Sequence, residues 1–169
     1  VTPKEPKKAA KKTPEKPESP IKYPEIFVSL ALGEDAITAT QAKEMLGWEE
    51  TDSADAAILV DENKKKIVCR NNGSNRPLNE SWARQLGRDI LNRNWADSRN
   101  GEGMSINGET IIIGCRAAVL SAQHRLIGLI LAEQMWENDE TGLLKKKWET
   151  APTIEGMIVY GVSEDPRVT

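Results

Sequence analysis

The chain has 169 residues, of which 38% are hydrophobic and 29% charged, and its formal net charge is −3. This length suits one globular domain beside a tail, and no segment approaches the roughly 20 apolar residues that a membrane-spanning helix needs. The acidic balance argues against an obligate, strongly basic nucleic-acid binder. The two cysteines, Cys69 and Cys115, form no metal-spaced cluster, and no signal peptide is recognisable. We therefore expect a protein of the reducing cytoplasm, without a membrane partner.

Residues 1–20 differ in composition from the rest of the chain. They hold six lysines, three glutamates and five prolines, and no aromatic or branched apolar residue follows Val1. Such a segment buries too little apolar surface to offset its ordering entropy, so it is predicted to be a disordered tail. Its net charge is +3 (six minus three), which leaves −6 for residues 21–169. The tail is interpreted either as an arm that contacts DNA or an acidic partner, or as a solubilising linker.

Short elements are predicted along the first part of the domain. The apolar residues 26–32 form either a surface strand or a helical turn. Thr38 and Gln41 match a capping box, which predicts a helix that runs to Leu46 and stops at Gly47. The apolar runs 56–60 and 66–69 surround a charged turn, and this pattern predicts a β-hairpin.

A second helix is predicted after Asn79, which is its expected N-cap. The residues of its predicted buried stripe recur at four-residue steps: Leu78, Trp82, Leu86 and Ile90. Arg84 and Arg88 lie on a neighbouring stripe, which is interpreted as solvated, with a nucleic-acid contact face as the alternative. Residues 95–107 are polar and contain glycine, so they are predicted to form a loop, either a flap over a site or an insertion.

The centre of the domain is an apolar run over residues 109–120. It is predicted to form two short strands interrupted at residues 114–116, followed by a helix from Gln123 to about Trp136. Trp148 is expected to pack inward while the lysines before it are solvated, and residues 153–162 alternate as a closing strand. The order of these elements predicts a compact α+β domain, with a small mixed β-sheet and packed helices.

A polar cluster stands where the central strand passes into the central helix: Ser121, Ala122, Gln123, His124 and Arg125. The first turn of a helix presents backbone N–H groups and the positive end of the helix dipole, and both favour a bound anion. Arg125 adds a cation, and Gln123 and the only histidine of the chain add hydrogen-bonding side chains. The pattern indicates a phosphate site; the alternative is a structural or solvated histidine beside an arginine.

The sequence from Ser121 to Leu126, S-A-Q-H-R-L, resembles the (D/S)-G-Q-H-R-L signature of ParB/sulfiredoxin-like domains. Asn75-Arg76-Pro77-Leu78 and Asn107-Gly108-Glu109-Thr110 resemble earlier boxes of that family in the same order, so the resemblance extends from about residue 37 to the end. It implies that the strand-to-helix motif cradles nucleotide phosphates, as for CTP in ParB proteins and ATP in sulfiredoxins, with Mg²⁺ as counter-ion. It also implies that Asn75 and Arg76 lie near the nucleotide.

The resemblance thus implies a ParB-like domain over residues 21–169 that recognises a nucleotide or a nucleic-acid phosphate in a DNA-associated protein. DNA and a second copy of the chain, as a homodimer, are the implied partners, and a C-terminal continuation with further contacts is expected to be missing. The glycine of the signature is Ala122 here, and its methyl group is expected to block backbone approach to a phosphate or to forbid a positive φ. The cysteine of sulfiredoxins is Gln123 here, so redox repair is not expected.

Other functions stay open at this point. A protein-interaction module that kept the fold and lost the ligand is one alternative, because Ala122 replaces the glycine. A nucleoside triphosphatase and a ParB-like nuclease are others, although no cluster of metal-binding acids is visible in the sequence and no catalytic residue can be assigned. Glu109 has no second acid at a suitable spacing, so no metal site is predicted.

Overall fold

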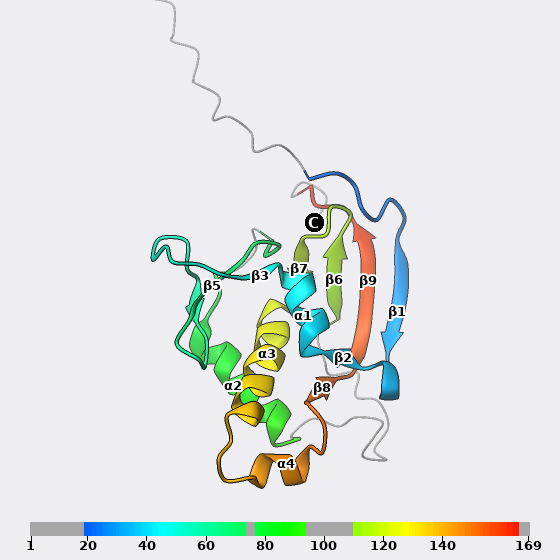
Figure 1. The fold of residues 1–169 in the computed structure, drawn as a ribbon. Coiled ribbons are helices and arrows are strands. Elements are labelled where there is room, and N and C mark those ends of the chain that lie inside the picture. The colour runs from blue at the N-terminus through cyan, green and yellow to red at the C-terminus, as the bar shows by residue number, and fades with distance from the viewer. Residues whose placement is uncertain (1–18, 74–76, 94–109, 166–169) are drawn as a thin grey trace, which may run out of the picture.

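A computed structural model describes residues 19–73, 77–93 and 110–165 of the chain (Figure 1). The described residues form a mixed α+β fold, as the order of predicted elements indicates. Its strands are β1 (Phe27–Ala31), β2 (Ile37–Thr38), β3 (Trp48–Glu50), β4 (Leu59–Val60), β5 (Lys66–Cys69), β6 (Ile111–Gly114), β7 (Val119–Ser121), β8 (Thr153–Ile154) and β9 (Gly156–Val162). Its helices are the 3₁₀ turn η1 (Gly33–Asp35) and α1 (Ala39–Leu46), α2 (Glu80–Leu91), α3 (Gln123–Glu137) and α4 (Leu143–Lys147).

The largest sheet is mixed and has the strand order β1-β9-β6-β7. β9 runs antiparallel to β1 and parallel to β6, while β6 and β7 form an antiparallel pair. A second sheet, β3-β5-β4, is antiparallel, and β2 pairs with β8. The predicted hairpin of residues 56–69 is therefore confirmed, and the expected closing strand is divided into β8 and β9 at Glu155.

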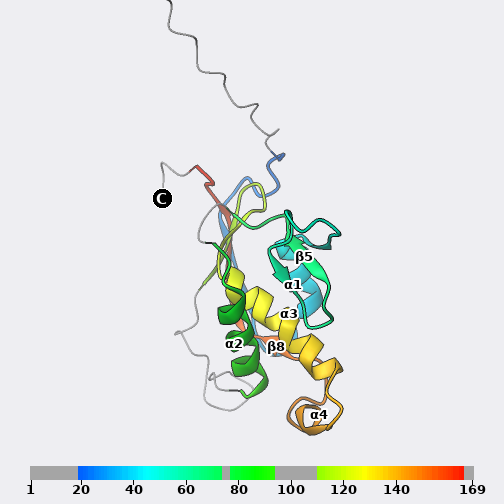
Figure 2. The ribbon, with the colours of Figure 1, turned by 90° about the vertical axis from the view of Figure 1, so that its left-hand side faces the viewer.

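Helix α3 is the centre of the hydrophobic core. Figure 2 looks along the four-stranded sheet and shows α1 and α3 on the same side of it. The described apolar residues of α3 are buried around most of its circumference: Leu126, Ile127, Leu129, Ile130, Leu131 and Ala132. A helix that is apolar on all sides needs neighbours on all sides. Helices α1 and α2 contact α3 directly, and the four-stranded sheet lies beside it (Figure 2). None of the helices in the described parts of the chain is long and apolar enough to cross a membrane.

Helices α2 and α3 approach each other closely at two glycines. A Cβ atom at Gly87 would lie 2.9 Å from the carbonyl oxygen of Gly128, and one at Gly128 would lie 3.1 Å from the carbonyl oxygen of Ala83. Leu86 and Ile90 of the predicted stripe are buried as expected, and the close contact adds Ala83 and Gly87 to the buried face of α2. Trp82 is 51% exposed, so its place in the predicted buried stripe is wrong.

The capping signals of α1 and α2 are confirmed. Thr38 and Gln41 form the predicted capping box, and Gly47 ends α1 in the left-handed conformation with φ 63°. The side chain of Asn79 accepts a hydrogen bond from the Trp82 N–H at 3.0 Å, which caps α2. These local signals depend on side chains within one helical turn, which is why the sequence indicates them directly.

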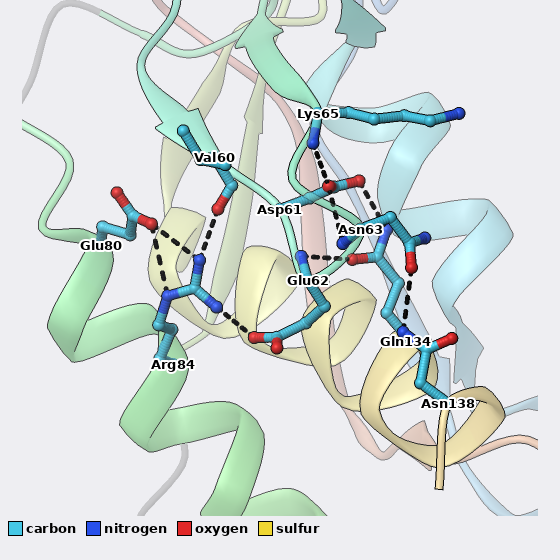
Figure 3. Close-up of polar contacts among 9 residues, drawn as sticks. All are labelled: Val60, Asp61, Glu62, Asn63, Lys65, Glu80, Arg84, Gln134 and Asn138. Carbon is cyan, nitrogen blue, oxygen red and sulfur yellow. Dashed lines mark hydrogen bonds and ion pairs between the residues drawn. The ribbon is translucent and has the colours of Figure 1, made fainter.

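Arg84 is not on a solvated face, in contrast to the prediction. Its side chain is 23% exposed and its guanidinium group donates to the carboxylates of Glu62 and Glu80 and to the carbonyl oxygen of Val60 (Figure 3). Two of these acceptors belong to the β4–β5 hairpin, 22 and 24 residues away in the sequence. A helical-face pattern cannot reveal them, because they come from another element.

Candidate functional site

The polar motif lies where the sequence predicts it, at a strand-to-helix junction. β7 ends at Ser121, which pairs with Ile112 of β6, and α3 begins at Gln123. Ala122 links them as the N-cap residue of α3. The predicted adjacency of the two central strands and the single helix after them is therefore confirmed.

Ala122 adopts the left-handed conformation, with φ 70° and ψ 24°. This conformation costs a residue with a Cβ atom roughly 1–2 kcal/mol, and glycine adopts it freely. The expectation that the methyl group forbids a positive φ is thus wrong, because Ala122 adopts that φ in the fold despite the cost. Alanine has no polar side-chain atom, so Ala122 offers no cap to the first turn, and α3 shows no N-cap side-chain hydrogen bond among the described residues.

Gln123 turns its side chain back toward the sheet. It is buried, and its Nε2 donates a hydrogen bond of 3.1 Å to the carbonyl oxygen of Val119. The amide therefore fixes the junction between β7 and α3. This is a positioning role, and it differs from the ligand-facing role that the signature implies.

His124 connects the first turns of α3 and α2. Its Nε2 accepts a hydrogen bond of 2.9 Å from the backbone N–H of Asn79, the N-cap residue of α2. Because Nε2 accepts this hydrogen bond, the ring carries its hydrogen on Nδ1, which makes Nδ1 the donor nitrogen of this histidine. The N-terminal ends of two helices thus lie side by side, joined by this bond.

Arg125 is buried, with 7% of its surface exposed, and its Nη2 lies 3.3 Å from the carbonyl oxygen of Glu155, the residue between β8 and β9. The Glu155 carboxylate in turn accepts a hydrogen bond of 2.6 Å from the backbone N–H of Gly33. His124 and Arg125 therefore contact different neighbours, α2 and the β8–β9 corner. Neither lines the cavity that lies between α1 and the sheet.

Several predicted features fall outside the described residues. Asn75 and Arg76, the loop of residues 95–107 and Glu109 belong to these parts of the chain, as does most of the predicted tail. Within residues 19–73, 77–93 and 110–165, no group of three or more histidine, cysteine, aspartate or glutamate side chains is placed to hold a metal ion.

The two cysteines lie away from the motif. Cys69 is buried in β5, and burial raises the pKa of its thiol to about 12. Cys115 follows the end of β6 and is half-buried. A thiol with so high a pKa is not a nucleophile at neutral pH, so Cys69 acts as a small apolar side chain of the core.

Sequence reasoning missed two members of this site, Asn79 and Glu155. Asn79 was recognised only as a helix cap, and its contact with His124 spans 45 residues of sequence. Glu155 contacts Arg125 over 30 residues and Gly33 over 122. No local pattern carries such contacts, so only the packing of the elements reveals them.

Comparison with known proteins adds no relative. A scan against protein-family models, a search of curated proteins and a search of solved structures each found no match.

Proposed function

We propose that the first turn of α3 binds a phosphate group of a nucleotide or a nucleic acid, as part of a ParB-like domain in a DNA-associated cytoplasmic protein. The observation that carries this proposal is the pairing of two helix N-termini through the Asn79–His124 hydrogen bond. Each N-terminus bears a partial positive charge from its helix dipole, so an anion near both is stabilised by two dipoles.

The described side chains have distinct roles in this proposal. Nδ1 of His124 donates to a phosphate oxygen, since Nε2 is already an acceptor for Asn79. Arg125 contributes positive charge within the first turn of α3, and its guanidinium group also contacts the β8–β9 corner. Ser121, at the end of β7, adds a hydroxyl group, and Gln123 holds the junction in place.

The family resemblance supplies the remaining parts of the proposal. Asn75 and Arg76 stand four and three residues before Asn79 in the sequence, and we assign them to the same phosphate site. CTP and ATP are the nucleotides that the resemblance favours. The described residues of the α3 first turn include no carboxylate, so Mg²⁺ would enter with the nucleotide, held by its phosphates. DNA and a second copy of the chain are the proposed partners.

The decisive experiment is a thermal-shift screen of the full chain with each ribonucleoside triphosphate and with duplex DNA, in the presence and absence of Mg²⁺. A ligand that binds only the folded state raises the melting temperature by mass action. A concentration-dependent rise with one nucleotide supports the proposal, and titration calorimetry then gives the dissociation constant. If no nucleotide and no DNA raises the melting temperature at millimolar ligand concentration, phosphate recognition is excluded.

Variants assign the binding to the first turn of α3. Charge-assisted hydrogen bonds contribute about 1.5–3 kcal/mol each, so His124→Ala and Arg125→Ala should each weaken binding by about tenfold to a hundredfold. Arg125→Lys, which keeps the charge, tests the site if Arg125→Ala unfolds the protein. Arg88→Ala on the exposed side of α2 is the matched control; Arg84 is unsuitable because it fastens the β4–β5 hairpin.

A protein-interaction module is the second candidate function, and one observation favours it. Arg125 is buried against the Glu155 carbonyl oxygen and Ala122 carries a methyl group, which together give the turn a structural role without a ligand. Ala122→Gly separates the two functions. It should strengthen nucleotide binding if the methyl group hinders the phosphate, whereas equal affinity in wild type, Ala122→Gly and folded Arg125→Ala would favour the interaction module.

A further inference from the structure

A concave surface lies away from the α3 motif. An open cavity of about 460 Å³ is lined by α1, the η1 turn and the strands β1, β9 and β6. Its lining includes neither Asn79 nor any residue of the turn 121–125. Ligand pockets in proteins occupy about 300–1,000 Å³, so this cavity has the size for a small molecule.

The floor of the cavity is apolar. The side chains that form it come from β1, β2, α1, β6 and β9: Ala31, Ile37, Met45, Ile113 and Ile158. All except Met45 are buried members of the core, so the floor is a rigid extension of the packed interior. These side chains expose little surface, so a flat apolar ligand body gains more from the aromatic rings beside them.

The phenylalanine and the two tyrosines of the chain cluster at one wall of the cavity. The sequence has one phenylalanine and two tyrosines, and all three lie together. The rings of Phe27 and Tyr160 stack with centroids 4.6 Å apart, and Tyr23 lies 4.9 Å from Tyr160; both tyrosines line the cavity. Burial, and then the nearby Tyr23, raise the pKa of Tyr160, so its hydroxyl group stays a neutral donor. Such a wall attracts flat rings and cations.

The charged residues of the lining give the cavity an excess of one negative charge. Asp35 of η1 and Glu44 of α1 are acidic, and Lys22 is basic. Lys22 is exposed, and its ammonium nitrogen lies 5.4 Å from the centroid of the Tyr23 ring. Within the described residues, neither Asp35 nor Glu44 takes part in an ion pair. Both carboxylates are therefore available to a cationic group.

We propose that this cavity binds a small organic cation, an amine carried on a flat aromatic body. The body covers the apolar floor beside Tyr23 and Tyr160, and the ammonium group is directed to Asp35 and Glu44. The lining of the cavity and the α3 motif share no residue, so this proposal and the phosphate proposal can fail independently.

The test uses three matched probes that differ only in their polar group: phenethylamine, 2-phenylethanol and 3-phenylpropionate. Each is titrated into the ¹⁵N-labelled full chain while the amide resonances are followed. Phenethylamine should shift the amides of Ile37, Glu44 and Tyr160, 2-phenylethanol should bind more weakly, and 3-phenylpropionate should bind weakest. Equal binding of the amine and the acid, or no shift with any probe at tens of millimolar, would overturn the proposal.

Charge variants test the acidic rim. Exposed ion pairs are weak, so Glu44→Gln and Asp35→Asn should each lower phenethylamine affinity by up to about fivefold and leave 2-phenylethanol binding unchanged. Lys22→Gln should raise phenethylamine affinity by a similar factor. Glu34→Gln is the matched control, because Glu34 lies in the same η1 turn and outside the lining. A loss for Glu34→Gln as large as that for Glu44→Gln would show that only the general negative charge matters.

A space-filling variant tests the cavity itself. Ser29 lies on β1, is exposed and lines the cavity, so Ser29→Phe should place a ring in the space without disturbing the core. Binding of both phenethylamine and 2-phenylethanol should be lost, at an unchanged melting temperature. Retention of wild-type shifts in folded Ser29→Phe would place the binding elsewhere and contradict the proposal.

Discussion

Near its C-terminal end, α3 carries a buried amide whose two polar atoms are both bonded, whereas its first turn follows an alanine that has no polar side-chain atom. Gln134 accepts from the Glu62 N–H at 3.0 Å and donates to Asp61 at 3.1 Å (Figure 3). Asp61 is also buried and accepts from the backbone N–H groups of Asn63 and Lys65 at 3.0 and 2.8 Å. We call this set of residues, together with Arg84, the hairpin clasp.

The two ends of α3 differ in whether their polar groups and backbone are satisfied or strained. In the hairpin clasp every polar atom of Asp61 and Gln134 has a partner, which is what a buried polar group needs if it is to stabilise a fold. At the first turn, Ala122 holds a costly left-handed conformation and leaves the helix end without a cap of its own. Strain of this kind persists where the surrounding structure demands it and often marks a functional position.

The largest expected effect comes from removing the centre of the hairpin clasp. Asp61→Ala leaves two backbone N–H groups and the Gln134 amide without their acceptor, so the free energy of unfolding should fall by about 3 kcal/mol. Urea unfolding followed by tryptophan fluorescence measures it. Asp52→Ala, at an exposed position, is the control, and a loss below about 1 kcal/mol would contradict the structural role of the clasp.

Arg84→Ala should cost somewhat less, about 2 kcal/mol, because Glu62 and the Val60 carbonyl oxygen remain near solvent after the guanidinium group is removed. Arg88→Ala, one turn further along α2 and exposed, should change the free energy of unfolding by less than about 0.5 kcal/mol. If the two substitutions have equal effects, Arg84 behaves as the solvated side chain that the sequence pattern indicates.

The buried thiol of Cys69, in strand β5 of the same hairpin, should make the free energy of unfolding depend on pH. Its pKa is about 12 in the fold against 9.0 for an ordinary thiol, because burial disfavours the thiolate. Between these values the unfolded chain loses the proton first, so stability falls as pH rises, by about 1.4 kcal/mol at pH 10. Cys69→Ala should flatten this decline in an unfolding series from pH 8 to 10.5. At pH 8, Cys69 should resist alkylation until Asp61→Ala loosens the hairpin.

Ala122→Gly should have the smallest effect on stability and the opposite sign. Glycine removes the cost of the left-handed conformation, and its greater freedom in the unfolded chain offsets part of the gain, so the free energy of unfolding should rise by about 0.5–1 kcal/mol. Ala132→Gly within the same helix is the control and should destabilise by at least about 1 kcal/mol. Destabilisation by Ala122→Gly would mean that the methyl group, buried in the core, contributes more packing than strain.

Local signals in the sequence determined much of the fold. The pattern alone correctly predicts four features, because each depends on residues close together in the sequence. They are the capping box of Thr38 and Gln41, the Asn79 cap, the hairpin around residues 61–65 and the apolar helix α3. The same holds for the placement of residues 121–125 at a strand-to-helix junction. In each case the interaction that fixes the element lies within the element or at its ends.

Only the tertiary structure decided which side chains meet. Trp82 is exposed because the close contact of Gly87 with Gly128 sets the rotation of α2. Arg84 is held in place because two of its hydrogen-bond acceptors belong to a hairpin that is distant in the sequence. The contacts of His124 with Asn79 and of Arg125 with Glu155 likewise join elements far apart in the sequence. The packing of whole helices and strands fixes these pairs. The sequence pattern of one element does not show which face of another element it will contact.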